Sequence, residues 1–327
     1  MTAPLPAFHL TRPHDVQTAI AARSAHAGSR FLAGGTDLLV GIRHGLCQPE
    51  HLIDLSGVAE LAAVSVTKTG ARIGAGVTIA ALLRMPALTG TYRALAQAAE
   101  AIGGPGHRAL GTIGGNLCLA TRCTYYNQSE WWRAANGYCL KHNGDVCHVA
   151  PQGQRCHAAF TGDLAPALLA LGAEVEIAGA QERRRIPLGE LYAEDGRAHL
   201  RLADDELVVA VRLPPRPPRS GYAKVRVRGA IDYPLAGVAV ALAASAGAAR
   251  TLRIALTGTN SRPFVLAGTE AFIGCALDDK ALLEIDRLVQ KQVQPMRTTV
   301  VSAQYRRLAA AGLARRLAAN LFAEATA

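Results

Sequence analysis

The sequence has few aromatic residues, no apolar run long enough to cross a membrane, and no Cys-x-x-Cys pair. Its longest apolar runs, such as 236–249, fall short of the ~20 residues that a membrane-spanning helix needs. Residues 1–12 contain two prolines and no apolar signal-peptide core. We therefore expect a soluble, cytoplasmic protein that binds no membrane.

Positive charge is in excess, with 35 Lys and Arg against 25 Asp and Glu and a formal charge of +10. The basic residues are scattered and form no tract interleaved with aromatics, so the sequence does not favour a nucleic-acid partner. Two interpretations stay open: a positive surface that attracts an acidic protein, and a merely solvated face.

The seven cysteines are unevenly distributed, because five of them fall within 39 residues. From Cys123, the next three follow after 16, 8 and 9 residues, at Cys139, Cys147 and Cys156. Without a Cys-x-x-Cys pair, a zinc ribbon, a zinc finger and a thioredoxin-type site are all disfavoured. A set of four soft thiolates suits an iron–sulfur cluster or Zn²⁺. The spacing alone leaves both open, together with unligated thiols.

The segment around these cysteines, at about 119–158, holds five of the chain's sixteen aromatic residues, including both tryptophans. It is otherwise polar and lacks the periodic apolar residues that would fold it by burial. A disordered insertion would be poor in aromatics, whereas a central metal site would supply the missing organisation. We therefore predict an ordered, metal-bearing insertion.

Two glycine-rich stretches are candidates for binding a phosphate group. The first is Leu32-Ala33-Gly34-Gly35-Thr36-Asp37, between a predicted strand and a predicted helix, and the second runs from Gly111 to Leu117. Glycines let the backbone approach a ligand closely, and amides leading into a helix favour an anion. The first stretch has neither the Rossmann nor the Walker pattern. For the first, a glycine turn capped by Thr36 is the alternative.

Hydrophobic periodicity predicts a mixture of helices and short strands along the whole chain. The predicted helices are 14–23, 37–44, 91–102, 164–171 and 298–322, and the predicted strands are 30–33, 51–54, 64–66, 71–73, 174–177, 206–212, 222–228, 237–243 and 251–257. Asp163 precedes one helix and is placed to cap it. The proline-rich run 214–218 predicts a stiff, extended linker between domains.

Four stretches together resemble the flavin-binding subunits of molybdenum hydroxylases, among them the medium subunits of carbon monoxide dehydrogenase and the flavin domain of xanthine dehydrogenase. They are 32–38, 112–116, 162–171 and 222–235. The resemblance implies an α+β fold: a two-lobed FAD-binding domain of the molybdenum hydroxylase flavoprotein type (PCMH-like), and a C-terminal α+β domain with a small antiparallel sheet. The corresponding limits are 1–56 and 57–216 for the two lobes and 219–324 for the C-terminal domain.

The resemblance also implies an FAD site. Amides of Gly34, Gly35, Gly114 and Gly115 would serve the pyrophosphate, with help from the hydroxyls of nearby threonines. The implied cofactor-binding residues are Leu32, Ala33, Gly34, Gly35, Thr36, Asp37, Ile102, Gly103, Gly111, Thr112, Gly114, Gly115, Asn116, Asp163, Leu207 and Lys224. No catalytic acid, base or nucleophile is expected on this chain.

The chain departs from most such subunits by its insertion, since 47 positions separate Asn116 from Asp163. In this respect it is similar to the beta subunit of 4-hydroxybenzoyl-CoA reductase, whose insertion binds a 4Fe–4S cluster. This resemblance implies that Cys123, Cys139, Cys147 and Cys156 ligate the cluster. It leaves out Cys118, which we expect to be a buried thiol.

The implied function is electron transfer for the reductive dehydroxylation of 4-hydroxybenzoyl-CoA to benzoyl-CoA. Electrons would pass from reduced ferredoxin through the 4Fe–4S cluster and FAD to a 2Fe–2S small subunit and a molybdenum-cofactor large subunit, in a dimer of heterotrimers. Two alternatives stay open. One is the flavin subunit of a related dehydrogenase of the xanthine or carbon monoxide dehydrogenase type, and the other is a non-enzymatic scaffold that binds zinc.

Overall fold

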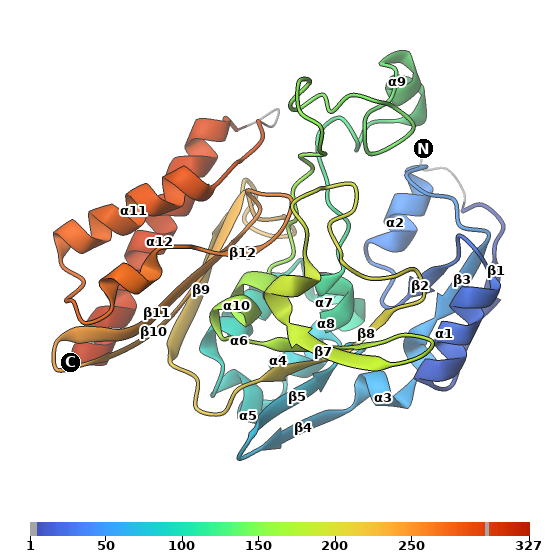
Figure 1. Cartoon of the computed structure of the whole chain (residues 1–327). Helices are drawn as coiled ribbons and strands as arrows, with labels where there is room; N and C mark the ends of the chain where they lie inside the picture. Colours follow the sequence, from blue (N-terminus) through green and yellow to red (C-terminus); the bar gives the residue numbers. More distant parts are fainter. Residues whose placement is uncertain (1–4, 298–300) are drawn as a thin grey trace.

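The computed structural model describes residues 5–297 and 301–327 and contains three β-sheets (Figure 1). The first is a parallel sheet in the order β1-β3-β2, and short helices follow β1 and β2. Its elements are β1 (His9–Thr11), α1 (Val16–Ala25), β2 (Arg30–Leu32), α2 (Leu38–Arg43) and β3 (His51–Asp54). Asp15 and Thr18 form a capping box that starts α1.

The second sheet is antiparallel, in the order β4-β5-β8-β6-β7. Its strands are β4 (Val64–Thr67), β5 (Gly70–Gly74), β6 (Glu174–Ala178), β7 (Arg183–Pro187) and β8 (Leu207–Leu213). Residues alternate between its faces, so Ile73, Val175 and Val211 lie in the core while Arg72 and Arg212 face outward. Helical segments accompany this sheet: η1 (Leu55–Gly57), α3 (Ala59–Ala62), α4 (Ile79–Leu83), α5 (Pro86–Thr89), α6 (Arg93–Ala101), α7 (Pro105–Leu110), α8 (Ile113–Leu117), α10 (Leu164–Ala170) and η2 (Leu188–Leu191).

The third sheet, β12-β11-β10-β9, is antiparallel and belongs to the C-terminal part of the chain. Its elements are β9 (Arg219–Val225), β10 (Ala236–Ser245), β11 (Ala248–Thr257), β12 (Phe264–Val265), η3 (Thr269–Phe272), α11 (Asp279–Gln292) and α12 (Ala303–Thr326). Along β10, Val238 and Val240 pack in the core shared with α11 and α12. The alternate residues Ala239 and Ala241 point to the opposite face of the sheet and belong to the main core. Because their side chains are small, α10 can pack closely against this face.

The predicted fold class is confirmed, whereas several predicted elements need correction. The strand predicted at 222–228 is β9, which starts at Arg219 and ends at Val225. The first residues of the helix predicted at 298–322 lie outside the described residues, and the described helix α12 runs from Ala303 to Thr326. The linker 214–218 is not fully extended, because Arg216 has a φ of +49° and bends it. The domain limits 1–56, 57–216 and 219–324 stay a prediction.

The cysteine-rich insertion is ordered and projects from the body of the protein (Figure 1, green). It contains α9 (Glu130–Ala135), which Ser129 caps. The two ends of the insertion pair at a neck, where the backbones of Arg122 and Ala159 exchange hydrogen bonds of 2.9 and 2.8 Å. Among the described residues, no helix combines the length and the apolar character needed to cross a membrane.

Candidate functional site

Two cavities meet between the lobes, with volumes of about 370 and 620 Å³. Both are lined by Gly34 and Gly115, so the two glycine-rich stretches face each other at the junction. At Gly34 a Cβ would lie only 1.9 Å from the carbonyl oxygen of Leu110. Only glycine fits this close approach of two backbone segments. The site can therefore accept an elongated ligand that passes between the glycine stretches.

The first glycine stretch offers free backbone donors. Among the described residues, the amides of Gly34, Gly35, Thr36 and Asp37 have no hydrogen-bond acceptor in the protein. Asp37 precedes α2, and these residues line the smaller cavity. A run of unpaired amides at the start of a helix is suited to a phosphate group.

The second glycine stretch does not supply the amide donors that we predicted. The amide of Gly114 donates to the carbonyl of Ala75 at 2.7 Å, and that of Gly115 donates to Oγ1 of Thr112 at 3.1 Å. These bonds build the turn into α8 and use both amides. The contribution of this stretch is instead its lack of side chains, because a Cβ at Gly114 would lie 2.7 Å from Cβ of Ala75.

Two polar side chains beside the smaller cavity have capacity for a ligand. Oγ1 of Thr161 is buried and, among the described residues, has no hydrogen-bond partner. Asn116 accepts a 3.0 Å hydrogen bond from the amide of Leu164 through Oδ1, so its side-chain NH₂ is left to donate. Because an unsatisfied buried hydroxyl is costly, Thr161 needs a polar partner at this point, which a bound ligand or a water molecule would supply.

Asp163 holds a buried ion pair rather than the helix cap that we predicted. Its Oδ1 lies 2.9 Å from Nζ of Lys224, and Tyr222 donates a 2.6 Å hydrogen bond to the same oxygen. No cap bond forms, since Asp163 itself has helical backbone angles and Asn116 bonds the first amide of α10. Burial raises the pKa of Asp163, and the charge of Lys224 opposes that shift. The pair joins the cavity to β9.

Most of the predicted cofactor-binding residues lie around these two cavities. The smaller one is lined by Ala33, Gly34, Gly35, Thr36, Asp37, Ile102, Gly103, Gly111, Thr112, Gly115, Asn116 and Asp163, and the larger one by Gly114 and Leu207 in addition to residues that the two share. Leu32 and Lys224 do not line either cavity. Lys224 acts on the smaller cavity indirectly, through its ion pair with Asp163. Leu32 lies behind the glycine loop, where one of its side-chain carbons is 3.4 Å from the position that a Cβ of Gly35 would occupy.

Sequence reasoning missed many of the residues that line the cavities, among them Arg30, Thr161, Tyr233 and, as a lining residue, Cys118. Thr161 and Tyr233 belong to or adjoin stretches that we had matched, so proximity to those motifs was an available signal. Arg30 precedes the first glycine stretch and carried no signal of its own. Cys118, predicted to be a buried thiol, is half-buried at the wall of both cavities, and desolvation of its sulfur raises its pKa to about 12.

The four cysteines of the insertion lie in one neighbourhood. Cys139, Cys147 and Cys156 are buried, and Cys123 is half-buried. The pKa of Cys123 is raised to about 11, mainly by burial and to a smaller extent by the nearby thiols of Cys156 and Cys139. Cys156 in turn interacts with Cys147 and has its pKa raised mainly by burial. The thiols of Cys139 and Cys156 are thus close enough to Cys123, and that of Cys147 to Cys156, to influence one another electrostatically.

The four thiols are not arranged as metal ligands in this structure, contrary to the prediction. Within residues 5–297 and 301–327, no three His, Cys, Asp or Glu side chains are placed together as metal ligands. Metal binding and the convergence of its ligands are coupled, since the metal itself supplies the attraction that draws the four sulfur atoms together. A half-buried cation does accompany them. Nζ of Lys141 donates to the carbonyls of Thr121 and Gly196 at 2.9 and 2.8 Å.

The helix α2 connects the cavity to the insertion. At its start, Asp37 lines the cavity and forms a 2.6 Å ion pair with Arg122, at the neck of the insertion. Just past its end, the carbonyl of Gly45 accepts a 2.8 Å hydrogen bond from Arg133, and that of Leu46 accepts one of 3.3 Å from Tyr126. The insertion therefore rests on both ends of α2, and its position relative to the cavity is defined.

Two family models match the chain. A model described as "FAD binding domain in molybdopterin dehydrogenase" matches residues 6–216. A second, described as "CO dehydrogenase flavoprotein C-terminal domain", matches residues 221–321. Together they cover both cavities, the insertion and the C-terminal sheet.

Similar proteins and solved structures support the same family. The chain is 28% identical over 312 residues to the carbon monoxide dehydrogenase medium chain of Afipia carboxidovorans, covering 94% of both chains. It is 33% identical over 257 residues to the aldehyde oxidoreductase FAD-binding subunit PaoB of Escherichia coli, covering 75% of this chain and 79% of that one. A crystal structure of Cu,Mo-CO dehydrogenase contains a chain that superposes with a TM-score of 0.80 at 26% identity, over 98% of this chain and 99% of that chain.

The fold and the site define a flavoprotein component of a larger oxidoreductase. The chain belongs to the FAD-binding subunits of the molybdenum hydroxylase family, of the type represented by the carbon monoxide dehydrogenase medium chain. The two cavities, the free amides of Gly34–Asp37 and the unsatisfied hydroxyl of Thr161 are consistent with FAD as the cofactor.

Proposed function

We propose that this chain is the FAD- and 4Fe–4S-binding electron-transfer subunit of a molybdenum enzyme that reduces 4-hydroxybenzoyl-CoA to benzoyl-CoA. The reaction takes two electrons and two protons, removes the phenolic hydroxyl and releases water. The chain takes electrons from reduced ferredoxin and passes them to 2Fe–2S clusters and molybdenum on partner subunits. Substrate chemistry takes place on the molybdenum subunit, in a dimer of heterotrimers.

One observation carries this proposal: four thiols lie in a single inserted lobe that rests on α2, whose first residue adjoins the flavin cavity. Four soft sulfur ligands are the donor set of an iron–sulfur cluster. The residues that hold it are Cys123, Cys139, Cys147 and Cys156. Lys141 supports this assignment, because its charge interacts favourably with Cys156 and Cys123, although burial lowers its pKa to about 8.

The FAD role uses the residues around the two cavities. The amides of Gly34–Asp37 bind the pyrophosphate, Arg30 adds positive charge beside the larger cavity, and the hydroxyl of Thr161 satisfies its hydrogen bond with the cofactor. Asp163 is held in place by Lys224 and Tyr222 at the wall of the smaller cavity. When bound, FAD supplies a redox centre that exchanges electrons with one-electron and two-electron partners.

A second function fits the comparisons equally well. The carbon monoxide dehydrogenase medium chain and the aldehyde oxidoreductase subunit are named for oxidative reactions. On that interpretation the chain serves a dehydrogenase, and electrons leave the substrate through FAD. The insertion favours the reductive function, because an added one-electron centre is useful for receiving electrons from a one-electron donor such as ferredoxin.

The direction of electron flow separates the two functions. The complex that co-purifies with this chain is assayed for benzoyl-CoA formation from 4-hydroxybenzoyl-CoA with a low-potential one-electron donor. In parallel, iron, acid-labile sulfide, zinc and flavin are measured per chain. Benzoyl-CoA, iron and sulfide are the expected results. Oxidation of an aldehyde or a purine by the same complex, with no reduction of the CoA ester, would establish the dehydrogenase. Zinc without flavin would identify the scaffold.

Arg122 tests the route between the insertion and the flavin. We expect Arg122→Ala to retain FAD and iron but to slow flavin reduction by a ferredoxin-type donor by about tenfold or more, because the neck loses its anchor on Asp37. Rapid-mixing absorbance measures the rate. Arg155→Ala is the matched control, since Arg155 ties the other end of the insertion to Glu194 and does not contact α2. Equal rates in wild type and Arg122→Ala would contradict the route.

A further inference from the structure

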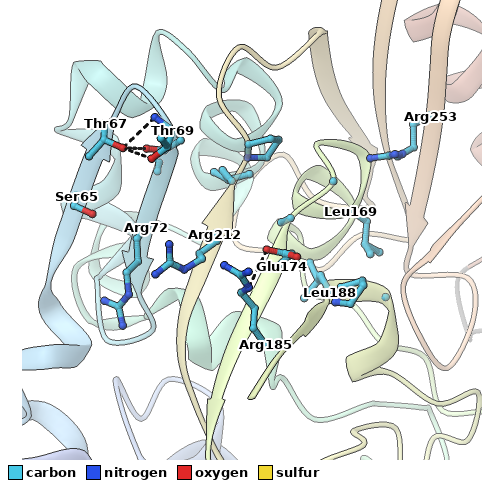
Figure 2. A pocket seen from close by; sticks show the side chains of 18 of the residues that line it. Ser65, Thr67, Thr69, Arg72, Leu169, Glu174, Arg185, Leu188, Arg212 and Arg253 are labelled. Atoms are coloured by element: carbon cyan, nitrogen blue, oxygen red, sulfur yellow. Dashed lines mark hydrogen bonds and ion pairs between the residues drawn. The ribbon is translucent and has the colours of Figure 1, made fainter. Parts of the chain in front are cut away.

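A third cavity, of about 630 Å³, lies at the end of the five-stranded sheet where β4, β7 and β8 finish and β5 and β6 begin, against the C-terminal part of the chain (Figure 2). None of its lining residues belongs to either flavin cavity. Its size is that of a typical small-molecule site. It is therefore separate from the FAD site, and nothing in the proposed function uses it.

The lining of this cavity follows from the register of the sheet. Ser65, Arg72, Arg212 and Glu174 are paired in sequence across β4, β5, β8 and β6, so they form one transverse row. Strand alternation puts this row on the face opposite the core. Thr67 extends the row of hydroxyls along β4 and shares a 2.8 Å hydrogen bond with Thr69. A polar floor results, with hydroxyls at one side and guanidinium groups beyond them (Figure 2).

Positive charge exceeds negative charge in this lining, which has four arginines and one glutamate. Arg72 binds Glu176 through two nitrogens, and its Nη2 also contacts Glu60. Arg212 uses only Nε, in a bond to Glu176. Arg185 makes a long contact of 3.4 Å from Nε to Glu174. The terminal nitrogens of Arg212 and Arg185, which carry most of a guanidinium's donors, have no partner among the described residues.

The fourth arginine of the lining, Arg253, comes from the C-terminal sheet. It extends from β11 toward the cavity (Figure 2) and has no carboxylate partner among the described residues. Its Nη1 lies 2.5 Å from the position that a Cβ of Gly172 would occupy, so the absence of a side chain there makes room for the guanidinium. An arginine from a second sheet thus faces the same space as Arg185 and Arg212.

We propose that this cavity binds a phosphorylated small molecule. Guanidinium groups bind phosphate through paired N–H donors, and hydroxyls complete the shell. The phosphate lies between Arg185, Arg212 and Arg253. Leu169, which keeps a small exposed surface, adds an apolar contact for the organic part of the ligand (Figure 2).

Calorimetric titration of ADP into the FAD-loaded, full-length chain, in the assembly in which it is purified, tests the proposal. Bound FAD blocks the nucleotide site between the lobes, and the flavin spectrum shows that it stays bound. We expect one saturable site per chain, and Arg253→Ala and Arg185→Gln each to weaken binding by about tenfold or more. Arg250→Ala is the matched control, because it removes an exposed arginine from the same strand outside the cavity. It should leave the affinity unchanged.

Adenosine, which has no phosphate, serves as the neutral probe and should not bind. The proposal is overturned if ADP gives no saturable heat or if adenosine binds as well as ADP. An equal loss of affinity in Arg250→Ala would also overturn it, because it would show only a general effect of positive charge. Release of flavin during the titration would place ADP in the FAD site and would equally contradict the third cavity as its site.

Discussion

A Gly34→Ala variant is expected to lose most of its bound FAD. The added Cβ would lie 1.9 Å from the carbonyl oxygen of Leu110, where the two glycine stretches meet. The clash is with backbone, so the loop 34–37 must move and carry its free amides away from the pyrophosphate. Overpacking of this kind costs about 1–3 kcal/mol, and each 1.4 kcal/mol is tenfold in affinity. Flavin content after purification, and FAD affinity on reconstitution, measure the effect.

Gly106→Ala is the matched control for this experiment, since Gly106 lies in α7 near the same cavity and a Cβ there has nothing within 4 Å. It should bind FAD like the wild type. A far-ultraviolet spectrum and an unfolding midpoint show whether Gly34→Ala is still folded. A folded Gly34→Ala protein with full flavin occupancy would contradict the assignment of this loop to the cofactor.

Cys139→Ser is expected to remove iron from the purified protein while FAD stays bound. Cys139 is buried in the insertion beside Tyr126 and Leu46, away from the residues that line the flavin cavities. Serine is nearly isosteric but is a poor ligand for iron, so the loss of one of four thiolates should prevent cluster assembly. Iron and sulfide analysis and the visible spectrum, with flavin released and measured separately, give the two readouts.

Cys147→Ser should behave in the same way, whereas Cys275→Ser should not, because Cys275 is exposed and lies outside the insertion. If the iron content is unchanged in both insertion variants, these cysteines do not hold the metal. Loss of iron and of FAD together would show that the insertion and the flavin lobe unfold as one unit, and would contradict the separation of the two sites.

The close backbone approach at the site could be predicted from the sequence, because glycine is the residue that allows two backbone segments to lie in contact. Gly34 and Gly115 were predicted to allow a close backbone approach, and the structure brings both to the junction of the two cavities. The prediction of amide donors from the second stretch failed, since a sequence does not show which amides α8 and its neighbour Ala75 already use.

The role of Asp163 also depended on its surroundings. An aspartate before a helix is most simply a cap, but here Asn116, 47 positions earlier, binds the amide that needs capping. Asp163 is then free to pair with Lys224 and Tyr222 on a strand of another sheet. Contacts between residues so far apart in the chain are set by packing and not by local propensity.

The sequence by itself determined several of the helices and strands, the cysteine-rich insertion and the resemblance to flavin-binding subunits, because periodicity, turn residues and short motifs are local properties. Only the tertiary structure decided that the insertion rests on α2 through Arg122 and Arg133, that Thr161 faces the cavity without a partner, and that Arg253 joins the arginines of another sheet. Each of these depends on which surfaces of distant segments are buried together, and burial is a property of the folded chain alone.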